Sequence, residues 1–206
     1  MDEIGRRLHW ENVYGEKGER RVSWFQERAD ISLELIAAAR VGCNGAIIDI
    51  GGGASRLVDE LLRQGYQDVT VLDVSEAGLS IAKQRLAEQA PRVQWIVADV
   101  TQWEPLREYD LWHDRAAFHF LTGEADRSAY VARLLRALRP GGHAIIATFA
   151  LDGPERCSGL PVARYDGQRL SEALGDRFAL IATRRQQHMT PMGGAQQFQF
   201  STFKRR

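Results

Sequence analysis

The sequence predicts an α/β fold in which helices cover both faces of a mostly parallel β-sheet, a doubly wound architecture. Two observations support this prediction. Along residues 41–150, short apolar runs typical of buried strands alternate with segments whose apolar residues recur at helical spacing. Turns that contain glycine or proline separate the two kinds of segment. Because parallel neighbours in a sheet need a long crossover connection, usually a helix, this alternation favours a parallel sheet.

Residues 1–40 precede the alternation. Residues 1–22 are polar and contain several glycines, so we expect an arm or a short helix there. Residues 23–40 carry apolar side chains at helical spacing, and Gly42 follows as a stop signal. The N-terminal part is therefore predicted to be an arm followed by one helix.

The alternating part itself contains five strands and the helices between them. The predicted strands are residues 46–50, 68–74, 92–100, 109–114 and 143–150. The predicted helices are residues 55–65, 75–89 and 124–142. Gly65 ends the first helix, Ser75 is a suitable N-cap for the second, and Pro91 marks its end. A Pro-Gly-Gly sequence stops the third helix just before the fifth strand.

The C-terminal part departs from the alternation. A segment with glycine and proline, residues 152–166, precedes a short helix near residues 167–175. Residues 177–188 and 195–204 are predicted to be strands, and the link MTPMGG is predicted to join them as a hairpin. One strand of this hairpin must run antiparallel to the rest of the sheet. No repeat or linker interrupts the chain, so we expect one domain over residues 1–206.

Composition excludes several classes of protein. The formal net charge of zero argues against a broad nucleic-acid interface. The two cysteines lack CxxC spacing, which indicates a reducing compartment and neither a zinc site nor a disulfide framework. No apolar run reaches the roughly 20 residues that cross a bilayer, and the start MDEIGRRLHW lacks a signal peptide's apolar segment. We expect a cytoplasmic protein without metal, membrane or nucleic-acid partner; the sequence leaves the oligomeric state open.

The sequence IDIGGGASRL, residues 48–57, places three glycines between the first strand and the first helix. Glycines at such a turn let backbone N–H groups and the helix start face a ligand. The dinucleotide fingerprint G-x-G-x-x-G is incomplete, since Gly51 and Gly53 match but Arg56 replaces the third glycine. Asp49 would repel a pyrophosphate and favours a ligand with an ammonium group. S-adenosylmethionine carries an ammonium and a sulfonium, and it has no phosphate.

Two more acids follow strand ends. Asp73 ends the second strand, where a carboxylate can accept hydrogen bonds from ribose hydroxyls. Asp99 ends the third, where a carboxylate can accept from the exocyclic amine of adenine. Either acid could instead be a turn or helix-capping residue. Because ligands of such sheets bind at the carboxyl ends of the strands, these acids and Asp49 are expected to line one crevice.

With these motifs, the sequence resembles the class I S-adenosylmethionine-dependent methyltransferases. IDIGGGAS resembles the family's glycine motif, VTVLDVS its ribose-binding acid and WIVADV its adenine-binding motif. YDLWHDRAAFHFL and LLRALRPGGHAIIATF resemble the family's strand-four motif and the helix and strand that follow it. The resemblance covers residues 45–150. It implies a Rossmann-like, seven-stranded sheet of order 3-2-1-4-5-7-6, with a cofactor-binding half (residues 41–150) and a substrate-side segment with a terminal hairpin (residues 151–206).

The resemblance also implies roles for single residues. The glycines pass beneath S-adenosylmethionine, and Asp49 lies near its methionine end. Asp73 binds the ribose, Asp99 binds the adenine amine, and the valine after each acid packs on the adenine. The cofactor-binding residues implied in this way are Asp49, Gly51, Gly53, Asp73, Val74, Asp99 and Val100.

The arm sequence HWENVYGE resembles the arm that closes over the cofactor in such enzymes. Trp10, Tyr14 and Trp24 are therefore expected to cover the cofactor, or else to pin the arm to the core. Aromatic side chains in a polar arm need a surface to cover, which favours the first interpretation.

His113 and Asp114 end strand four, which borders the transferred methyl group in the family. The sequence after them resembles two subgroups, the thiopurine-methyltransferase-like enzymes of small molecules and certain protein-lysine methyltransferases. A base is needed only when the acceptor arrives protonated, and the candidate bases are Asp114, His113 and His188, in that order. Asp114 could instead form an ion pair with Arg115.

The predicted function is methyl transfer from S-adenosylmethionine, by in-line displacement, to a nucleophile on a small molecule. Protein-lysine methylation is the alternative, and a module that holds the cofactor without turnover is a third hypothesis. A nicotinamide oxidoreductase is disfavoured by the glycine missing at position 56 and by the missing Tyr-x-x-x-Lys pair, because Leu134 stands four residues after Tyr130.

Overall fold

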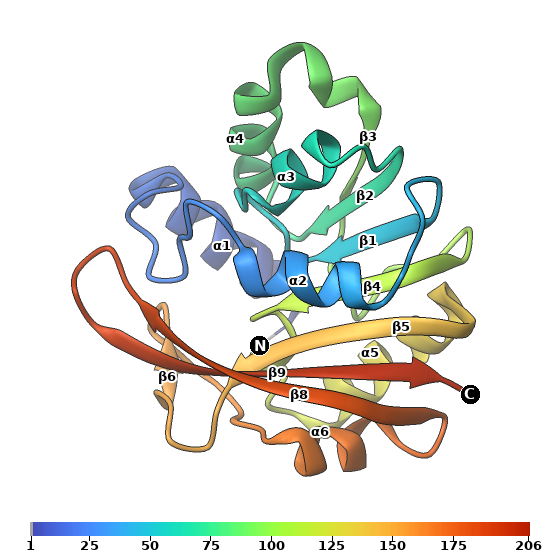
Figure 1. Cartoon of the computed structure of the whole chain (residues 1–206). Helices are drawn as coiled ribbons and strands as arrows, with labels where there is room; N and C mark the ends of the chain where they lie inside the picture. Colours follow the sequence, from blue (N-terminus) through green and yellow to red (C-terminus); the bar gives the residue numbers. More distant parts are fainter. Residues whose placement is uncertain (1) are drawn as a thin grey trace.

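The computed structural model describes residues 2–206 and contains a seven-stranded sheet of order β3-β2-β1-β4-β5-β9-β8 (Figure 1). Strands β1 to β5 are parallel, and β9 lies antiparallel to both β5 and β8. Counted in chain order without the short β6 and β7, this is the order 3-2-1-4-5-7-6. The expected doubly wound sheet with an antiparallel terminal hairpin is thus confirmed.

The sheet strands are β1 (Ala46–Ile50), β2 (Asp68–Asp73), β3 (Val93–Val97), β4 (Tyr109–Arg115), β5 (Leu138–Phe149), β8 (Phe178–Met189) and β9 (Ala195–Arg205). The α-helices are α1 (Glu3–Lys17), α2 (Asp30–Ala38), α3 (Leu57–Arg63), α4 (Glu76–Leu86), α5 (Glu124–Ala137) and α6 (Gly167–Leu174). Two 3-10 helices, η1 (Ala87–Arg92) and η2 (Phe118–Phe120), and a small hairpin of β6 (Arg156–Cys157) and β7 (Leu160–Pro161) complete the fold.

Two hydrophobic cores lie on opposite faces of the sheet. Successive side chains of a strand point to opposite faces, so in β1 Ile47 joins one core and Ile48 the other. The core that contains Ile47 is covered by apolar side chains of α2, α3 and α4. The core that contains Ile48 is covered by those of α5 and α6. This division decides which residues at the strand ends can meet.

Several boundaries differ from the sequence-based expectation, and those of three helices matter here. The polar N-terminal residues form α1, a full helix of 15 residues, with Asp2 as its N-cap. The next helix begins at Asp30 instead of residue 23. The helix expected over residues 124–142 ends at Ala137, because Pro140 disfavours helical backbone in the residue before it, and the chain joins β5 from Leu138.

Helix α1 lies across the carboxyl ends of the parallel strands and against α4 (Figure 1). The Glu11 carboxylate accepts hydrogen bonds from the backbone N–H groups of Glu76 (2.6 Å) and Ala77 (3.1 Å) at the start of α4. A carboxylate is favourable there because it satisfies free N–H groups and the positive end of the helix dipole. The contact fixes α1 over the edge of the sheet where ligands of this architecture bind.

Candidate functional site

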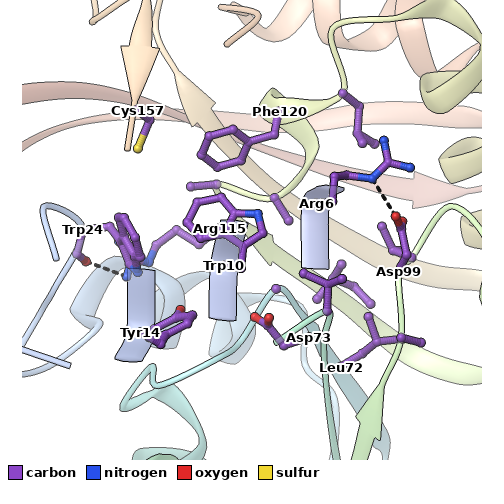
Figure 2. Close-up of a pocket in the computed structure, with 18 residues that line it drawn as sticks. Arg6, Trp10, Tyr14, Trp24, Leu72, Asp73, Asp99, Arg115, Phe120 and Cys157 are labelled. Carbon is purple, nitrogen blue, oxygen red and sulfur yellow. Dashed lines mark hydrogen bonds and ion pairs between the residues drawn. The ribbon is translucent and has the colours of Figure 1, made fainter. Parts of the chain in front are cut away.

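A cavity of about 740 Å³, measured with its open mouth, lies between α1 and the carboxyl ends of β1 to β4. Its polar and aromatic lining comes mainly from α1, from the turns after β2 and β3, and from the segment after β4 (Figure 2). The lining residues used below are Arg6, Trp10, Tyr14, Trp24, Gly51, Asp73, Val74, Asp99, Val100, Arg115, Phe120 and Cys157.

The turn after β1 brings the backbone close to its neighbours. Gly51 and Gly53 have φ angles of +64° and +43°, which non-glycine residues rarely adopt. A Cβ atom at Gly51 would lie 2.7 Å from the Cβ of Ala117, and one at Gly53 would lie 2.2 Å from the hydroxyl of Tyr14. Gly51 lines the cavity, whereas Gly53 lies directly against Tyr14.

Asp73 is buried at the end of β2 and lines the cavity. Its carboxylate accepts a hydrogen bond from the backbone N–H of Ser75 at 2.8 Å. Burial raises the pKa of Asp73 to about 7, and the nearby negative charge of Asp49 adds to the rise. A carboxylate placed here gains from hydroxyl donors, such as a ribose diol, that stabilise its ionised form.

Asp99 lies after β3 and is held from two sides. One of its oxygens accepts from the backbone and side chain of Thr101, at 2.9 and 2.8 Å. The other pairs with Arg6 of α1 at 2.6 Å, and Arg6 also pairs with Asp126 at 2.9 Å. Arg6, which the sequence analysis did not single out, therefore closes the cavity at its Asp99 end (Figure 2).

Aromatic side chains form the opposite part of the cavity. The Trp10 ring makes edge contacts with Trp24 at 5.6 Å and with Phe120 at 4.9 Å between centroids. Tyr14 lies 6.2 Å from Trp24, and burial raises the pKa of its hydroxyl. All three aromatic residues expected to cover the cofactor thus line the cavity.

Asp49 does not line the cavity. It is buried and faces the core under α2, where its carboxylate pairs with His113 Nδ1 at 2.7 Å. The other ring nitrogen of His113 hydrogen-bonds the hydroxyl of Ser32 at 2.9 Å. Each of these three residues is at most 3% exposed, so the chain of hydrogen bonds Asp49–His113–Ser32 is internal.

The other two candidate bases also lie outside the cavity lining. Asp114 faces the core under α5, where it accepts hydrogen bonds from Tyr130 at 2.7 Å and from the backbone of Ala117 and Phe118. Burial raises its pKa to about 6. These partners, and not Arg115, hold the Asp114 carboxylate. His188 Nε2 donates to the carbonyl of Ser23 at 2.8 Å, and burial lowers the pKa of this histidine.

Arg115 ends β4 and lines the cavity beside Trp24, to whose carbonyl it donates a hydrogen bond at 2.9 Å. Cys157, a free thiol whose pKa burial raises to about 11, lies on the same side (Figure 2). Neither residue was predicted to line the cavity. Within residues 2–206, no group of three or more His, Cys, Asp or Glu side chains is placed to hold a metal ion. In the same part of the chain, no helix has the length and apolar character to cross a bilayer.

Comparisons with known proteins relate the chain to methyltransferases. Residues 47–142 match the family model described as a methyltransferase domain. Trans-aconitate 2-methyltransferase of Acidovorax ebreus is 34% identical over 117 residues, which cover 56% of this chain and 43% of that protein. The eEF1A lysine and N-terminal methyltransferase of Bos taurus is 27% identical over 157 residues, covering 72% of this chain and 22% of its own length. The chain thus spans less than half of either relative.

A solved structure shares the whole fold. It is that of 1,6-didemethyltoxoflavin-N1-methyltransferase from Burkholderia thailandensis, with a TM-score of 0.74 at 23% identity, covering 98% of this chain and 89% of that one. At this identity the likeness concerns the fold alone. The family match covers the strands and turns that build the cavity, so residues 47–142 form a methyltransferase domain, and the chain has the fold of the class I, S-adenosylmethionine-dependent methyltransferases.

Proposed function

We propose that the chain binds S-adenosylmethionine in this cavity and transfers its methyl group to a nucleophile on a small molecule. The observation that carries the proposal is the position of Asp73 and Asp99 in one cavity, at the ends of adjacent strands and opposite an aromatic wall. The two carboxylates suit a ribose diol and an adenine amine, and Val74 and Val100 beside them supply an apolar surface for the base. The solved structure from Burkholderia thailandensis holds S-adenosylhomocysteine, which supports this choice of ligand.

The cofactor supplies a methyl group that is already activated by its sulfonium. The protein therefore needs mainly to bind the two reactants, align them and exclude water. Trp10 and Tyr14 of α1, with Trp24, would cover the reacting atoms. Because none of the three candidate bases lines the cavity, the proposal favours an acceptor that reaches the site ionised or that loses its proton to solvent.

A protein lysine is the second candidate acceptor, and the relative from Bos taurus favours it by name. The structure supports the small molecule instead. The part of the cavity away from Asp99, where the proposal places the acceptor, is walled by Trp10, Trp24 and Phe120, and Trp10 is packed against both of the others. A lysine inside a folded partner would have to pass this aromatic wall to reach the methyl group.

Cofactor binding is tested by calorimetry with S-adenosylhomocysteine. Asp73→Ala is expected to weaken binding by about 1.5–3 kcal/mol, because a charged acceptor of the ribose hydroxyls is lost. Glu172→Ala, an exposed change on α6, is the matched control and should leave the affinity unchanged. Wild-type protein that binds neither S-adenosylhomocysteine nor S-adenosylmethionine would refute the proposal.

Turnover is tested separately with methyl-labelled S-adenosylmethionine and a panel of small thiols, phenols, amines and carboxylic acids, beside lysine-containing protein extracts. Label transferred to a small molecule supports the proposal. Label found only on protein favours a protein lysine as the acceptor. Tight cofactor binding without transfer to any acceptor favours a module that holds the cofactor without turnover.

We further propose a cytoplasmic location without a membrane or nucleic-acid partner. The balanced charge of the chain and its two free cysteines, of which Cys43 is exposed, support this assignment.

A further inference from the structure

A single positive charge lies in the acceptor part of the cavity. Arg115 ends β4 on the same sheet face as His113, and its guanidinium lies beside Trp24, away from the Asp99 end (Figure 2). The walls around it are mainly apolar, formed by Trp10, Trp24 and Phe120. A charged group in such surroundings is costly unless another charge or several hydrogen bonds compensate it.

Within residues 2–206, few groups compensate the positive charge of Arg115. A guanidinium has five N–H donors, and the structure gives Arg115 one hydrogen bond, to the carbonyl of Trp24 at 2.9 Å. No carboxylate of the described chain lies within 4.0 Å of its nitrogen atoms, whereas Arg6 at the other end of the cavity pairs with both Asp99 and Asp126. Asp49 is the acid whose charge acts on Arg115, but its carboxylate is hydrogen-bonded to His113.

The remaining donors of Arg115 therefore suit an anionic group that enters the cavity. A carboxylate is the natural partner because its two oxygens match the guanidinium fork. Burial lowers the pKa of Arg115, which agrees with a charge that lacks a close partner until a ligand arrives.

We propose that Arg115 binds a carboxylate of the methyl acceptor, so that the acceptor class is a compact, largely apolar or aromatic acid. The inference rests on the proposed function and narrows it. The same charge repels the ammonium group of a lysine, which separates the two acceptor classes considered above. Trp10, Trp24 and Phe120 would then contact the apolar body of the acid while Arg115 fixes its orientation before the methyl group.

A carboxylate in this part of the cavity could also come from the amino-acid end of the cofactor, and the experiment distinguishes the two sources. Calorimetry measures S-adenosylhomocysteine binding to wild type, Arg115→Gln, Arg115→Lys and Arg184→Gln. Benzoate and benzamide, which have the same shape and differ in charge, are then titrated into each protein with and without saturating S-adenosylhomocysteine. Arg184 is an exposed arginine of β8 outside the cavity, so its variant is the matched control.

The proposal expects wild type and Arg184→Gln to bind benzoate at least tenfold more tightly than benzamide. The ratio should fall to about one in Arg115→Gln and recover in part in Arg115→Lys, with S-adenosylhomocysteine affinity unchanged within twofold. A wild-type ratio near one overturns the inference, and this result needs no variant to fold. A tenfold loss of S-adenosylhomocysteine affinity in Arg115→Gln with the benzoate ratio unchanged also overturns it, since Arg115 then binds the cofactor. Failure of wild type to bind S-adenosylhomocysteine would instead refute the proposed function.

Discussion

Asp49 and His113 are direct neighbours in register on the parallel strands β1 and β4, and their side chains hydrogen-bond at 2.7 Å within the core under α2. Ser32 of α2 completes the chain from the other side of the imidazole. His113 therefore joins the sheet to a helix and holds a buried carboxylate in place. Nothing in this arrangement presents the imidazole to the cavity.

His113→Ala is accordingly predicted to lower the free energy of unfolding by about 2–3 kcal/mol, because two buried polar groups lose their partner. Ser32→Ala removes only the outer hydrogen bond and should cost about 1 kcal/mol. Urea denaturation measures both. A His113→Asn variant that is as stable as wild type but has lost methyl transfer would show that His113 acts on the acceptor after all.

S-adenosylhomocysteine binding should depend on the ionisation of Asp73, whose pKa burial raises to about 7. Ribose hydroxyls favour the ionised carboxylate, so the bound state has the lower pKa and binding releases a proton below pH 7. Affinity should therefore rise as the pH increases from about 5 to about 7 and be flat above. Calorimetry in buffers of different ionisation enthalpy measures the proton release. In Asp73→Asn both effects should vanish, and a pH-dependence that persists in this variant would belong to another group.

Tyr130→Phe should destabilise the protein more at pH 8 than at pH 5. The folded pKa of Asp114, about 6, lies above the ordinary value of 3.8. The protonated form thus favours folding, and that contribution is full below about pH 4 and lost as the pH rises through 6. Removing the Tyr130 hydroxyl takes a donor from the ionised carboxylate, so the added cost, about 1–2 kcal/mol, is greatest where Asp114 is ionised.

Denaturation curves at the two pH values measure this difference. Tyr165→Phe is the matched control, since the structure gives the Tyr165 hydroxyl no hydrogen bond within residues 2–206, while its ring packs on Phe118 at 5.4 Å as that of Tyr130 does at 4.8 Å. An equal loss of stability at both pH values would mean that Asp114 keeps the same protonation state in the folded protein throughout this range, which would contradict the prediction.

Gly78→Ala should loosen α1. A Cβ at Gly78 would lie 2.8 Å from the Tyr14 ring, and Gly53 lies directly against the hydroxyl end of the same ring. We expect faster hydrogen exchange over residues 3–17 and weaker S-adenosylhomocysteine binding. Gly15→Ala is the control, because it meets no atom within 4 Å and should stabilise α1 by about 0.5–1 kcal/mol. Unchanged exchange in Gly78→Ala would show that Tyr14 does not hold the helix.

The parallel sheet and one side of the cavity could be predicted from local patterns, whereas the strand order was implied by the resemblance to the methyltransferase family. Alternation of strands and helices implies a parallel sheet, and the residues after strand ends, Asp73 and Asp99, then reach one edge. The end of α5 was misplaced because the restriction that Pro140 imposes on the preceding residue was underweighted.

The candidate bases show what local patterns leave open. His113 and Asp114 are consecutive in a strand, so their side chains point to opposite faces and meet different helices. That alternation was available in the sequence, but the presence of Ser32 and Tyr130 opposite them depends on how the helices pack. Arg6 had a usable signal: it precedes Trp10 and Tyr14 at intervals of four residues and so shares their helix face. Its partner Asp99, 93 residues away, could not be inferred in this way.

The position of α1 has a kinetic consequence. Arg6, Trp10 and Tyr14 of this helix line the cavity, and the helix is anchored at separate points to Asp99 and to the start of α4. If the product of the proposed reaction leaves past α1, the undocking of residues 3–17 sets a ceiling on turnover that no improvement in the chemical step can raise.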